Sequence, residues 1–304
     1  MQNAFRHFLC LLIDDAAFLK AGKISPHALA HGNWRFPNCL MAMGFGLMLI
    51  LTMVAQSTSA QTVTATITVG VNPSAVAINP VTNKIYVANI SSSSNNVSVI
   101  DGATNALTTL AAGTTPIAVA INPVTNKIYV VNLNSSTITV IDGATNALTT
   151  LTLAAGSGPS AVAINPVTNK IYVTNFSSGD VTVIDGANNA ITTLIAPSGP
   201  FAVAINPVTN KIYVANRFSN NVTVIDGATN ALITLAAGTN PIAVAINPVT
   251  NKIYVLNIGS SNVTVIDGAT NALTTLTVGT NPGAVAINPV TNKIYVANIN
   301  SNNV

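Results

Sequence analysis

The decapeptide INPVTNKIYV occurs six times in this chain without a single change, and this repetition constrains the fold more than any other feature. The tyrosine of each copy recurs at intervals of 43, 43, 41, 41 and 41 residues. A nearly fixed period of this length indicates an array of similar supersecondary units that stack to bury a shared core. The copies begin at Ile78, Ile121, Ile164, Ile205, Ile246 and Ile287.

Each repeat contains four short segments of strand-forming sequence. In the first repeat these are Ala75–Asn79, Lys84–Asn89, Asn96–Asp101 and Ala106–Ala111. The segments are rich in Val, Ile, Thr and Tyr, which favour strands, and they are too short for helices. Asn-Pro and Asp-Gly pairs between them are typical of tight turns. Four short strands in every ~40–45 residues predict an all-β fold, a β-propeller of four-stranded antiparallel blades.

The repeats predict about six blades, of which the last is incomplete. The sixth repeat stops at Asn303-Val304, two residues into its third strand, which suggests a truncated chain. Thr62–Gly70 aligns with the fourth strand of a repeat, as at Thr274–Gly279, and precedes the first complete repeat. A composite blade made from both ends would close the ring, and an open arc is the alternative. The blades start near Pro73, Pro116, Pro159, Pro200, Pro241 and Pro282.

The repeat pattern PxAVAINPVTNKIYVANxxxxNVTVIDGATNALxTL resembles the YVTN-type β-propeller repeat of bacterial and archaeal envelope and surface-layer-like proteins. The resemblance covers Thr62–Val304, and Tyr172–Asn175 is the literal YVTN. The family often has Ser-Pro-Asp-Gly at the first turn, whereas this chain has the longer Asn-Pro-Val-Thr-Asn. The resemblance implies a propeller fold and a location in the cell envelope, and it implies no catalytic residue.

Residues 1–60 are predicted to be an N-terminal extension with a signal peptide or anchor, and residues 61–304 the propeller. Cys39–Ala55 is an uncharged apolar run with Arg35 upstream, and Thr58 and Ala60 fit a cleavage site after Ala60. The alternative is an uncleaved anchor, because the run is at the short end of what spans a bilayer. The chain would then contact the membrane only through residues 39–55. Both interpretations predict a secreted, periplasmic or cell-surface propeller.

The residue types of the propeller limit which catalytic and metal sites it can contain. From Gln61 onward there is no His, Cys or Glu, and six Lys, one Arg and six Asp give a net charge of +1. A charge this near zero gives no basis for binding nucleic acid. The usual nucleophile–base pairs and metal sites are therefore missing, and Asp180 stands alone on a loop. We expect no catalytic residue, no metal, no cofactor and no enzymatic activity.

The lysine of the decapeptide supports two interpretations. Six lysines on one face would form a basic collar for a polyanion. Alternatively, each lysine pairs across the second hairpin with the aspartate that ends the third strand, which would cancel the positive field. We favour these ion pairs, because the register that places Asn89 opposite Asn96 also aligns each lysine with an aspartate. The pairs are Lys84 with Asp101, Lys127 with Asp142, Lys170 with Asp185, Lys211 with Asp226, and Lys252 with Asp267, whereas Lys293 has no aspartate in register.

The Asp-Gly turns, which read DGATN in most copies, could suggest calcium. A calcium site needs about six to eight oxygen ligands, whereas each turn offers one carboxylate. A tight turn in which Asp caps the backbone and Gly takes a positive φ explains the same residues. We therefore expect a structural turn at Asp101-Gly102 and at its copies.

The copies differ from one another mainly in two sets of loops. In an up-and-down blade the first and third turns share one face, and the second loops and inter-blade connections share the other. The second loops and inter-blade connections carry the variation, and DGANN at Asp185 is the one change on the other face. Loops on a rigid scaffold are the usual place for binding residues. The candidate binding residues there are Phe176, Phe201, Arg217 and Phe218. The alternative is that Phe176 and Phe218 only cover a blade edge.

These observations predict a secreted, non-enzymatic propeller that acts as a scaffold or binding module of the cell envelope. Its partner would be an unidentified protein or glycan of the envelope. The alternative is a periplasmic or extracellular propeller that binds a polyanion or glycan with its variable loops.

Overall fold

The computed structural model describes residues 63–90, 95–154 and 157–304. The chain divides into two compact units, Met1–Ala65 and Thr66–Val304, and the blades belong to the second. The apolar run Cys39–Ala55 and the cleavage site after Ala60 lie outside the described residues. Within the described ranges there is no helix with the length and apolar character needed to cross a membrane.

The described residues form twenty-two strands in six antiparallel sheets. Five sheets have four strands in sequence order, and the sixth has two. The blades are β1 (Pro73–Asn79), β2 (Lys84–Asn89), β3 (Asn96–Asp101), β4 (Leu107–Ala111); β5 (Pro116–Asn122), β6 (Lys127–Asn132), β7 (Thr137–Asp142), β8 (Leu148–Thr152); β9 (Pro159–Asn165), β10 (Lys170–Asn175), β11 (Asp180–Asp185), β12 (Ile191–Ile195); β13 (Pro200–Asn206), β14 (Lys211–Asn216), β15 (Asn221–Asp226), β16 (Leu232–Ala236); β17 (Pro241–Asn247), β18 (Lys252–Asn257), β19 (Asn262–Asp267), β20 (Leu273–Thr277); and β21 (Pro282–Asn288), β22 (Lys293–Asn298).

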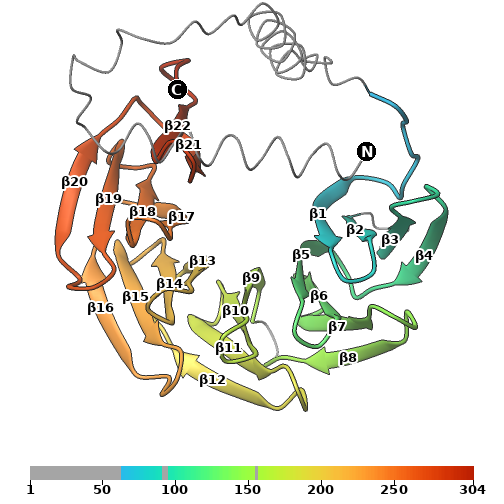
Figure 1. Cartoon of the computed structure of the whole chain (residues 1–304). Coiled ribbons are helices and arrows are strands. Elements are labelled where there is room, and N and C mark those ends of the chain that lie inside the picture. Colours follow the sequence, from blue (N-terminus) through green and yellow to red (C-terminus); the bar gives the residue numbers. More distant parts are fainter. Residues whose placement is uncertain (1–62, 91–94, 155–156) are drawn as a thin grey trace, which may run out of the picture. The chain divides into compact units, whose positions relative to one another are not determined.

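The six sheets stand side by side around a common centre, as the blades of a propeller do. The first strand of each blade lies nearest the centre, and the fourth strands β4, β8, β12, β16 and β20 lie at the periphery (Figure 1). Consecutive blades contact one another mainly through their first two strands. The predicted all-β propeller with about six blades and an incomplete last blade is confirmed.

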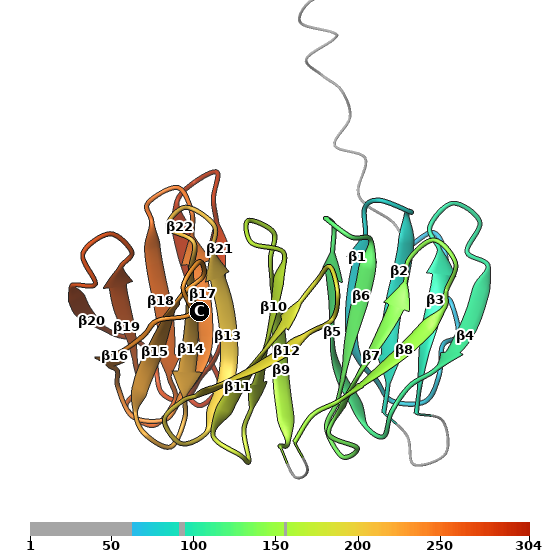
Figure 2. The ribbon, with the colours of Figure 1, turned by 90° about the horizontal axis from the view of Figure 1, so that it is seen from below.

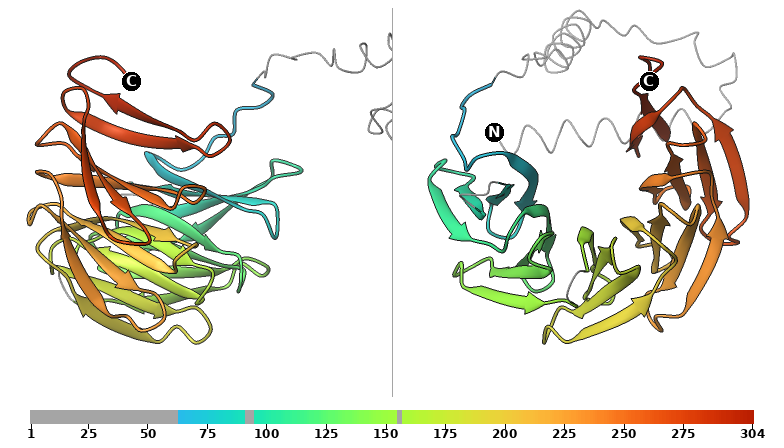
Figure 3. Two further views of the ribbon diagram at one scale, coloured as in Figure 1. Left: turned by 60° about the vertical axis from the view of Figure 1, so that its left-hand side comes forward. Right: turned by 180° about the vertical axis from the view of Figure 1, so that it is seen from behind.

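The described blades form an open arc. β1 and the β21–β22 sheet stand apart at its two ends (Figures 1 and 3). Val76 and Ile78 of β1 are 66% and 65% exposed, whereas the equivalent Val119 and Ile121 of β5 pack against the preceding blade. Residues 63–69 form no strand. The described residues therefore do not form a composite blade, and the open arc is the observed alternative.

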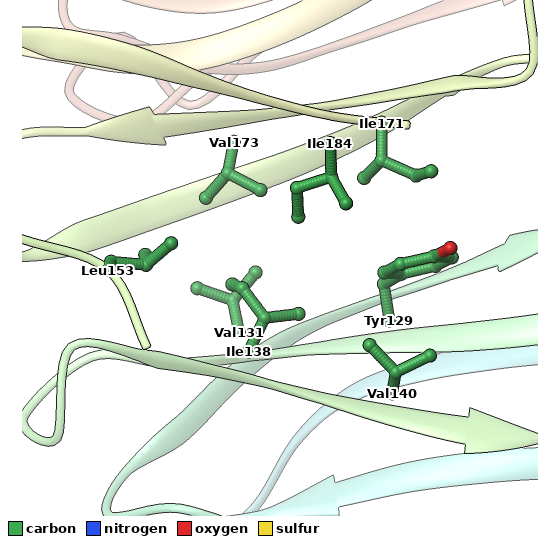
Figure 4. Packing of buried hydrophobic residues seen from close by; sticks show 8 residues of the cluster. All are labelled: Tyr129, Val131, Ile138, Val140, Leu153, Ile171, Val173 and Ile184. Carbon is green, nitrogen blue, oxygen red and sulfur yellow. The ribbon is translucent and has the colours of Figure 1, made fainter. Parts of the chain in front are cut away.

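The hydrophobic core consists of separate layers between neighbouring blades. In the layer of Figure 4, Tyr129 and Val131 on β6 and Ile138 on β7 face Ile171 and Ile184 of the next blade. All five side chains are fully buried. Burial of each stabilises the fold by about 1.5–3 kcal/mol. Every repeat supplies the same tyrosine and isoleucines, so that every complete junction forms a similar layer. The position of Val131 varies, with Ala88 in the first blade and Thr174 in the third.

The two faces of the propeller are built from different connections (Figure 2). On one face the first and third turns of a blade meet, and Gly102 N donates to Asn83 O at 2.8 Å. On the other face a second loop meets an inter-blade connection, and Leu133 N donates to Thr115 O at 2.9 Å. We call the first the turn face, made of the NPVTN and Asp-Gly turns, and the second the variable face. The predicted division of the loops between the two faces is the observed one.

The decapeptide joins each blade to the next on the turn face. Its first asparagine is fully buried and donates from Nδ2 to Oδ1 of the second asparagine in the following blade, as Asn79 does to Asn126 at 2.7 Å. The second asparagine has a positive φ, 53° at Asn126, which Asn tolerates better than most residues. The other links are Asn122 to Asn169, Asn165 to Asn210, Asn206 to Asn251, and Asn247 to Asn292.

Candidate functional site

The four candidate binding residues lie together on the variable face, at the junction of the third and fourth blades. Phe176 follows β10, Phe201 is the second residue of β13, and Arg217 and Phe218 follow β14. The ring of Phe176 meets Phe201 edge-on at a centroid distance of 5.8 Å and meets Phe218 at 5.0 Å. We call these four residues the aromatic–arginine site. Sequence reasoning proposed each of them but did not predict that they touch.

Arg217 lies across this cluster. Its Cζ atom is 5.4 Å from the centroid of Phe201, within the range of a cation–π contact. Its Nε is buried and makes no hydrogen bond to the described residues. Because Nε is buried, only the rest of this half-buried guanidinium can reach an acceptor that comes from outside. The side chain of Phe218 is 59% exposed, and its ring contacts that of Phe176.

The connection before the fourth blade holds the site in place. Gly199 has a φ of +75°, which favours glycine, and a Cβ at this position would lie 2.9 Å from Cδ2 of Phe218. Arg217 N donates to Gly199 O at 2.7 Å, and Ser219 Oγ donates to Ser198 O at 2.9 Å. Gly199 therefore allows the close approach of Phe218. Sequence reasoning missed its role, although IAPSGP is the most divergent of the connections.

Ser160 and Thr174 of the third blade also position the site, and sequence reasoning did not identify them. Ser160 Oγ lies 3.2 Å from the carbonyl oxygens of both Pro200 and Phe201. Thr174 Oγ1 lies 2.8 Å from Ser160 Oγ. These contacts anchor the backbone of Phe201 to the preceding blade. Only a three-dimensional structure reveals them, because the residues are about 40 positions apart in sequence.

The lysines of the decapeptide behave differently from the prediction. The register is as expected, with each lysine opposite the aspartate of its own blade. Only Lys252 forms the predicted ion pair, with Nζ 2.7 Å from Asp267 Oδ2. The other four Nζ atoms donate instead to the Asp-Gly turn of the next blade. Their acceptors are Gly143 O and Asn146 Oδ1 for Lys84, Gly186 O and Asn189 Oδ1 for Lys127, Gly227 O and Asn230 Oδ1 for Lys170, and Gly268 O and Asn271 Oδ1 for Lys211.

The predicted ion pairs of Lys84, Lys127, Lys170 and Lys211 with Asp101, Asp142, Asp185 and Asp226 are therefore wrong at the level of the side chains. The physical reason is the turn of the next blade and not the hydrogen bonds within each aspartate's own turn, because Asp267 makes the same turn bonds and still pairs with Lys252. Asp101 Oδ1 accepts from Ala103 N, Thr104 N and Thr104 Oγ1 at 2.8–3.0 Å. The turn of the next blade offers the lysine a carbonyl and an amide oxygen. The sixth blade has no Asp-Gly turn in this sequence, and so Lys252 turns back to Asp267.

In the Asp-Gly turns the aspartate caps the backbone as the sequence suggested, since Asp101 accepts from Ala103 N and Thr104 N. The expected positive φ is not at Gly102 but at Asn105, where φ is 62°. Hydrogen bonds donated by the backbone N–H and the hydroxyl of Thr104 hold the pKa of Asp101 below its usual value. Asp142 and Asp226 show the same shift for the same reason. Across residues 63–90, 95–154 and 157–304, no group of three His, Cys, Asp or Glu side chains is arranged to hold a metal ion.

Comparison with known proteins shows the fold. No family model matches the chain, and no curated protein matches it. Among solved structures, the chain is similar to a streptogramin B lyase, with 13% identity, a TM-score of 0.62, and coverage of 75% of this chain and 83% of the lyase. A virginiamycin B lyase from Staphylococcus aureus is 14% identical, with a TM-score of 0.63 and coverage of 75% of this chain and 84% of the lyase. A putative 6-phosphogluconolactonase from Bacteroides uniformis is 17% identical, with a TM-score of 0.62 and coverage of 79% of this chain and 81% of that protein.

These neighbours contradict the expectation that the chain has no enzymatic activity. Proteins named as enzymes share its propeller fold. The expectation was drawn from the lack of His, Cys and Glu after Gln61, and residue types alone do not exclude activity on this fold. At identities of 13–17% the likeness shows the fold and transfers no substrate.

Proposed function

We propose that this chain is an exported, YVTN-type propeller that binds an acidic saccharide of the cell envelope at the aromatic–arginine site. The observation that carries the proposal is the position of Arg217, which is half-buried on the variable face with its guanidinium 5.4 Å from the ring centroid of Phe201. The exposed side chain of Phe218 belongs to the same cluster through its contact with Phe176. The site thus offers a cation and an apolar surface together.

The chemistry of the site favours a ligand with one carboxylate and one flat apolar face. Arg binds carboxylates through two parallel hydrogen bonds, and exposed aromatic rings pack against apolar ring faces. An acidic monosaccharide unit within a glycan has both features. A polyanion fits less well, because the four lysines that would have formed a basic collar donate to neighbouring turns. Arg217 is the single arginine after Gln61.

The envelope location is supported by two features of the sequence. Cys39–Ala55 is an apolar run of the kind that exports a protein, and the repeat resembles that of envelope proteins. Glycans with acidic units are available to an exported protein in that location.

The test is calorimetric titration of the protein with the methyl glycoside of galacturonic acid, which has one carboxylate, and with the neutral methyl glycoside of galactose. We expect binding of the acidic sugar and weaker binding of the neutral one. Arg217→Gln and Phe218→Ser should each weaken binding about tenfold, which corresponds to about 1.4 kcal/mol. NMR spectra of the sugar after incubation report whether it is bound unchanged or converted.

The matched control is Ile258→Ala, which changes the equivalent of Arg217 in the fifth blade on the same face. This change should leave binding at the wild-type level. Equal binding of the two sugars, or wild-type affinity in both site variants, would overturn the proposal.

A further inference from the structure

The Asp-Gly turns of the blades differ from one another at one position. Most have a threonine two residues after the glycine, whereas the turn of the third blade has Asn188 there. The turns of the second, third and fourth blades can be compared directly, because each of these blades packs between two others and each turn has a buried glycine. Their Asp-Gly pairs are Asp142-Gly143, Asp185-Gly186 and Asp226-Gly227.

The threonine hydroxyl holds the aspartate in two of these three turns. Asp142 Oδ1 accepts from Thr145 N at 2.8 Å and from Thr145 Oγ1 at 3.0 Å. Asp226 Oδ1 accepts from Thr229 N at 2.8 Å and from Thr229 Oγ1 at 2.9 Å. In both turns the same hydroxyl also accepts from a backbone N–H at 3.2 Å. A hydroxyl can make both bonds because it is a donor and an acceptor at once.

Asn188 does not replace the hydroxyl in this role. Its Oδ1 accepts from Ala190 N at 2.8 Å, and an amide oxygen has no hydrogen to donate. Among the described residues, Asp185 Oδ1 therefore accepts two bonds, from Ala187 N at 2.8 Å and from Asn188 N at 3.2 Å. The second bond is longer than its counterparts in the neighbouring turns. The carboxylate of Asp185 is thus held by fewer and weaker contacts than those of the other two turns.

An Asp-Gly pair can rearrange without an enzyme, because glycine has no side chain to hinder the reaction. The glycine nitrogen attacks Cγ of the aspartate and a C–N bond forms. One carboxyl oxygen leaves as water with the amide hydrogen and a proton from solvent, which gives a five-membered succinimide. A second water molecule opens the ring. Where it breaks the bond between the nitrogen and the original main-chain carbonyl carbon, the product is isoaspartate, whose main chain passes through Cγ.

We propose that Asp185 is a modification site of this kind, at which isoaspartate forms faster than at the two neighbouring turns. Attack requires the carboxyl group to leave its hydrogen bonds and turn its Cγ toward the glycine nitrogen. The glycine nitrogens themselves are restrained alike, since Gly143, Gly186 and Gly227 each donate to a backbone carbonyl at 2.8–2.9 Å. The difference between the turns therefore lies in the bonds that hold the aspartate.

The modification acts on the contact between the second and third blades. Gly186 O and Asn189 Oδ1 accept from Lys127 Nζ at 3.1 and 3.4 Å. Isoaspartate adds one carbon to the main chain immediately before Gly186, which displaces both acceptors from the lysine. This turn lies on the turn face, whereas the aromatic–arginine site lies on the variable face. The inference therefore does not depend on the proposed function.

The test compares the three pairs in one sample of the full chain, aged at neutral pH. Trypsin places them on separate peptides, because Lys170 and Lys211 lie between them. Liquid chromatography separates the isoaspartyl from the aspartyl form of each peptide, and electron-transfer fragmentation identifies it. We expect isoaspartate to form about fivefold or more faster at Asp185 than at Asp142 and Asp226, as the loss of one hydrogen bond implies.

Two matched variants and an unfolded control test the cause. Asn188→Thr should lower the rate at Asp185 to that of its neighbours, and Thr229→Asn should raise the rate at Asp226. In concentrated urea the three rates should become equal, because all three pairs stand in the same sequence, VIDGA. The proposal is overturned if the three rates are equal in the folded protein, if the excess at Asp185 persists in urea, or if either variant leaves its rate unchanged.

Discussion

Lys84 Nζ in the first blade lies 2.9 Å from the carbonyl oxygen of Gly143 in the second blade. This contact bypasses Asp101, which is opposite Lys84 in its own sheet. The lysines of the next three blades also donate to the glycine carbonyl of the following blade's turn. The links between buried asparagines lie on the same face. The repeated decapeptide is therefore best understood as a connector between blades. Each copy holds the turn of the following blade with one lysine and one asparagine.

Replacement of Lys127 by methionine tests this connector. Lys127→Met keeps the aliphatic length and removes the hydrogen bonds to Gly186 O and Asn189 Oδ1. Because the lysine is partly exposed, we expect a loss of about 1 kcal/mol in the free energy of unfolding. Urea denaturation measures it. The matched variant Lys252→Met removes an ion pair instead, and its smaller cost should shrink at high salt. A Lys127→Met protein as stable as the wild type would contradict the connector role.

Removal of a buried asparagine should lower the free energy of unfolding by more than Lys127→Met does. Asn165 is fully buried, donates to Asn210 Oδ1 at 2.7 Å and accepts from Val167 N at 3.0 Å. Asn165→Ala removes both bonds, and each contributes about 0.5–1.5 kcal/mol because the partners Asn210 and Val167 are not fully buried. We expect a loss of about 1–3 kcal/mol in chemical denaturation.

Asn288→Ala is the control for that loss. Asn288 is the same residue of the last blade, and it bonds only within its own turn, to Val290 N and Thr291 N. Its replacement should cost about 1 kcal/mol or less. Similar losses for the two variants would mean that the link between blades contributes little.

The strands and the faces could be predicted from the sequence because both depend on local patterns. β2 and β3 have the predicted bounds, and β1 begins at Pro73, two residues before the predicted Ala75. The partners of the lysines could not be predicted in this way. Strand register specifies what lies opposite within a sheet, whereas the reach of Lys84 depends on the distance between two sheets.

The candidate site also depends on contacts between blades, which sequence patterns do not show. Phe176, Phe201, Arg217 and Phe218 were found because they differ from the other copies at equivalent positions. That comparison could not show that Phe176 bridges two rings of the next blade. Nor could it identify Ser160, whose hydroxyl anchors Phe201 through the backbone.

The open arc predicts unequal effects of one substitution at two equivalent positions. Val119 packs in the layer between the first two blades, whereas Val76 is 66% exposed. Val119→Thr buries a hydroxyl without a partner and should cost about 1–3 kcal/mol. Val76→Thr should change stability by less than about 0.5 kcal/mol. Thermal unfolding of the two variants makes the comparison. An equal cost would show that something covers the first blade in solution.

The buried tyrosines of the decapeptide predict how stability depends on alkaline pH. Burial raises the pKa of Tyr129, Tyr172 and Tyr213 to about 12, from about 10 in an unfolded chain. Between these values the unfolded chain loses protons that the folded chain retains. The stabilisation is therefore complete below about pH 10 and is lost as the pH rises through about 12. Urea denaturation at a series of pH values should show the midpoint falling across this window.

Tyr172→Phe removes one of the three groups and should make the fall shallower while leaving the midpoint at pH 7 nearly unchanged. A wild-type midpoint that stays level from pH 10 to 12 would show that the hydroxyls reach solvent in the folded protein.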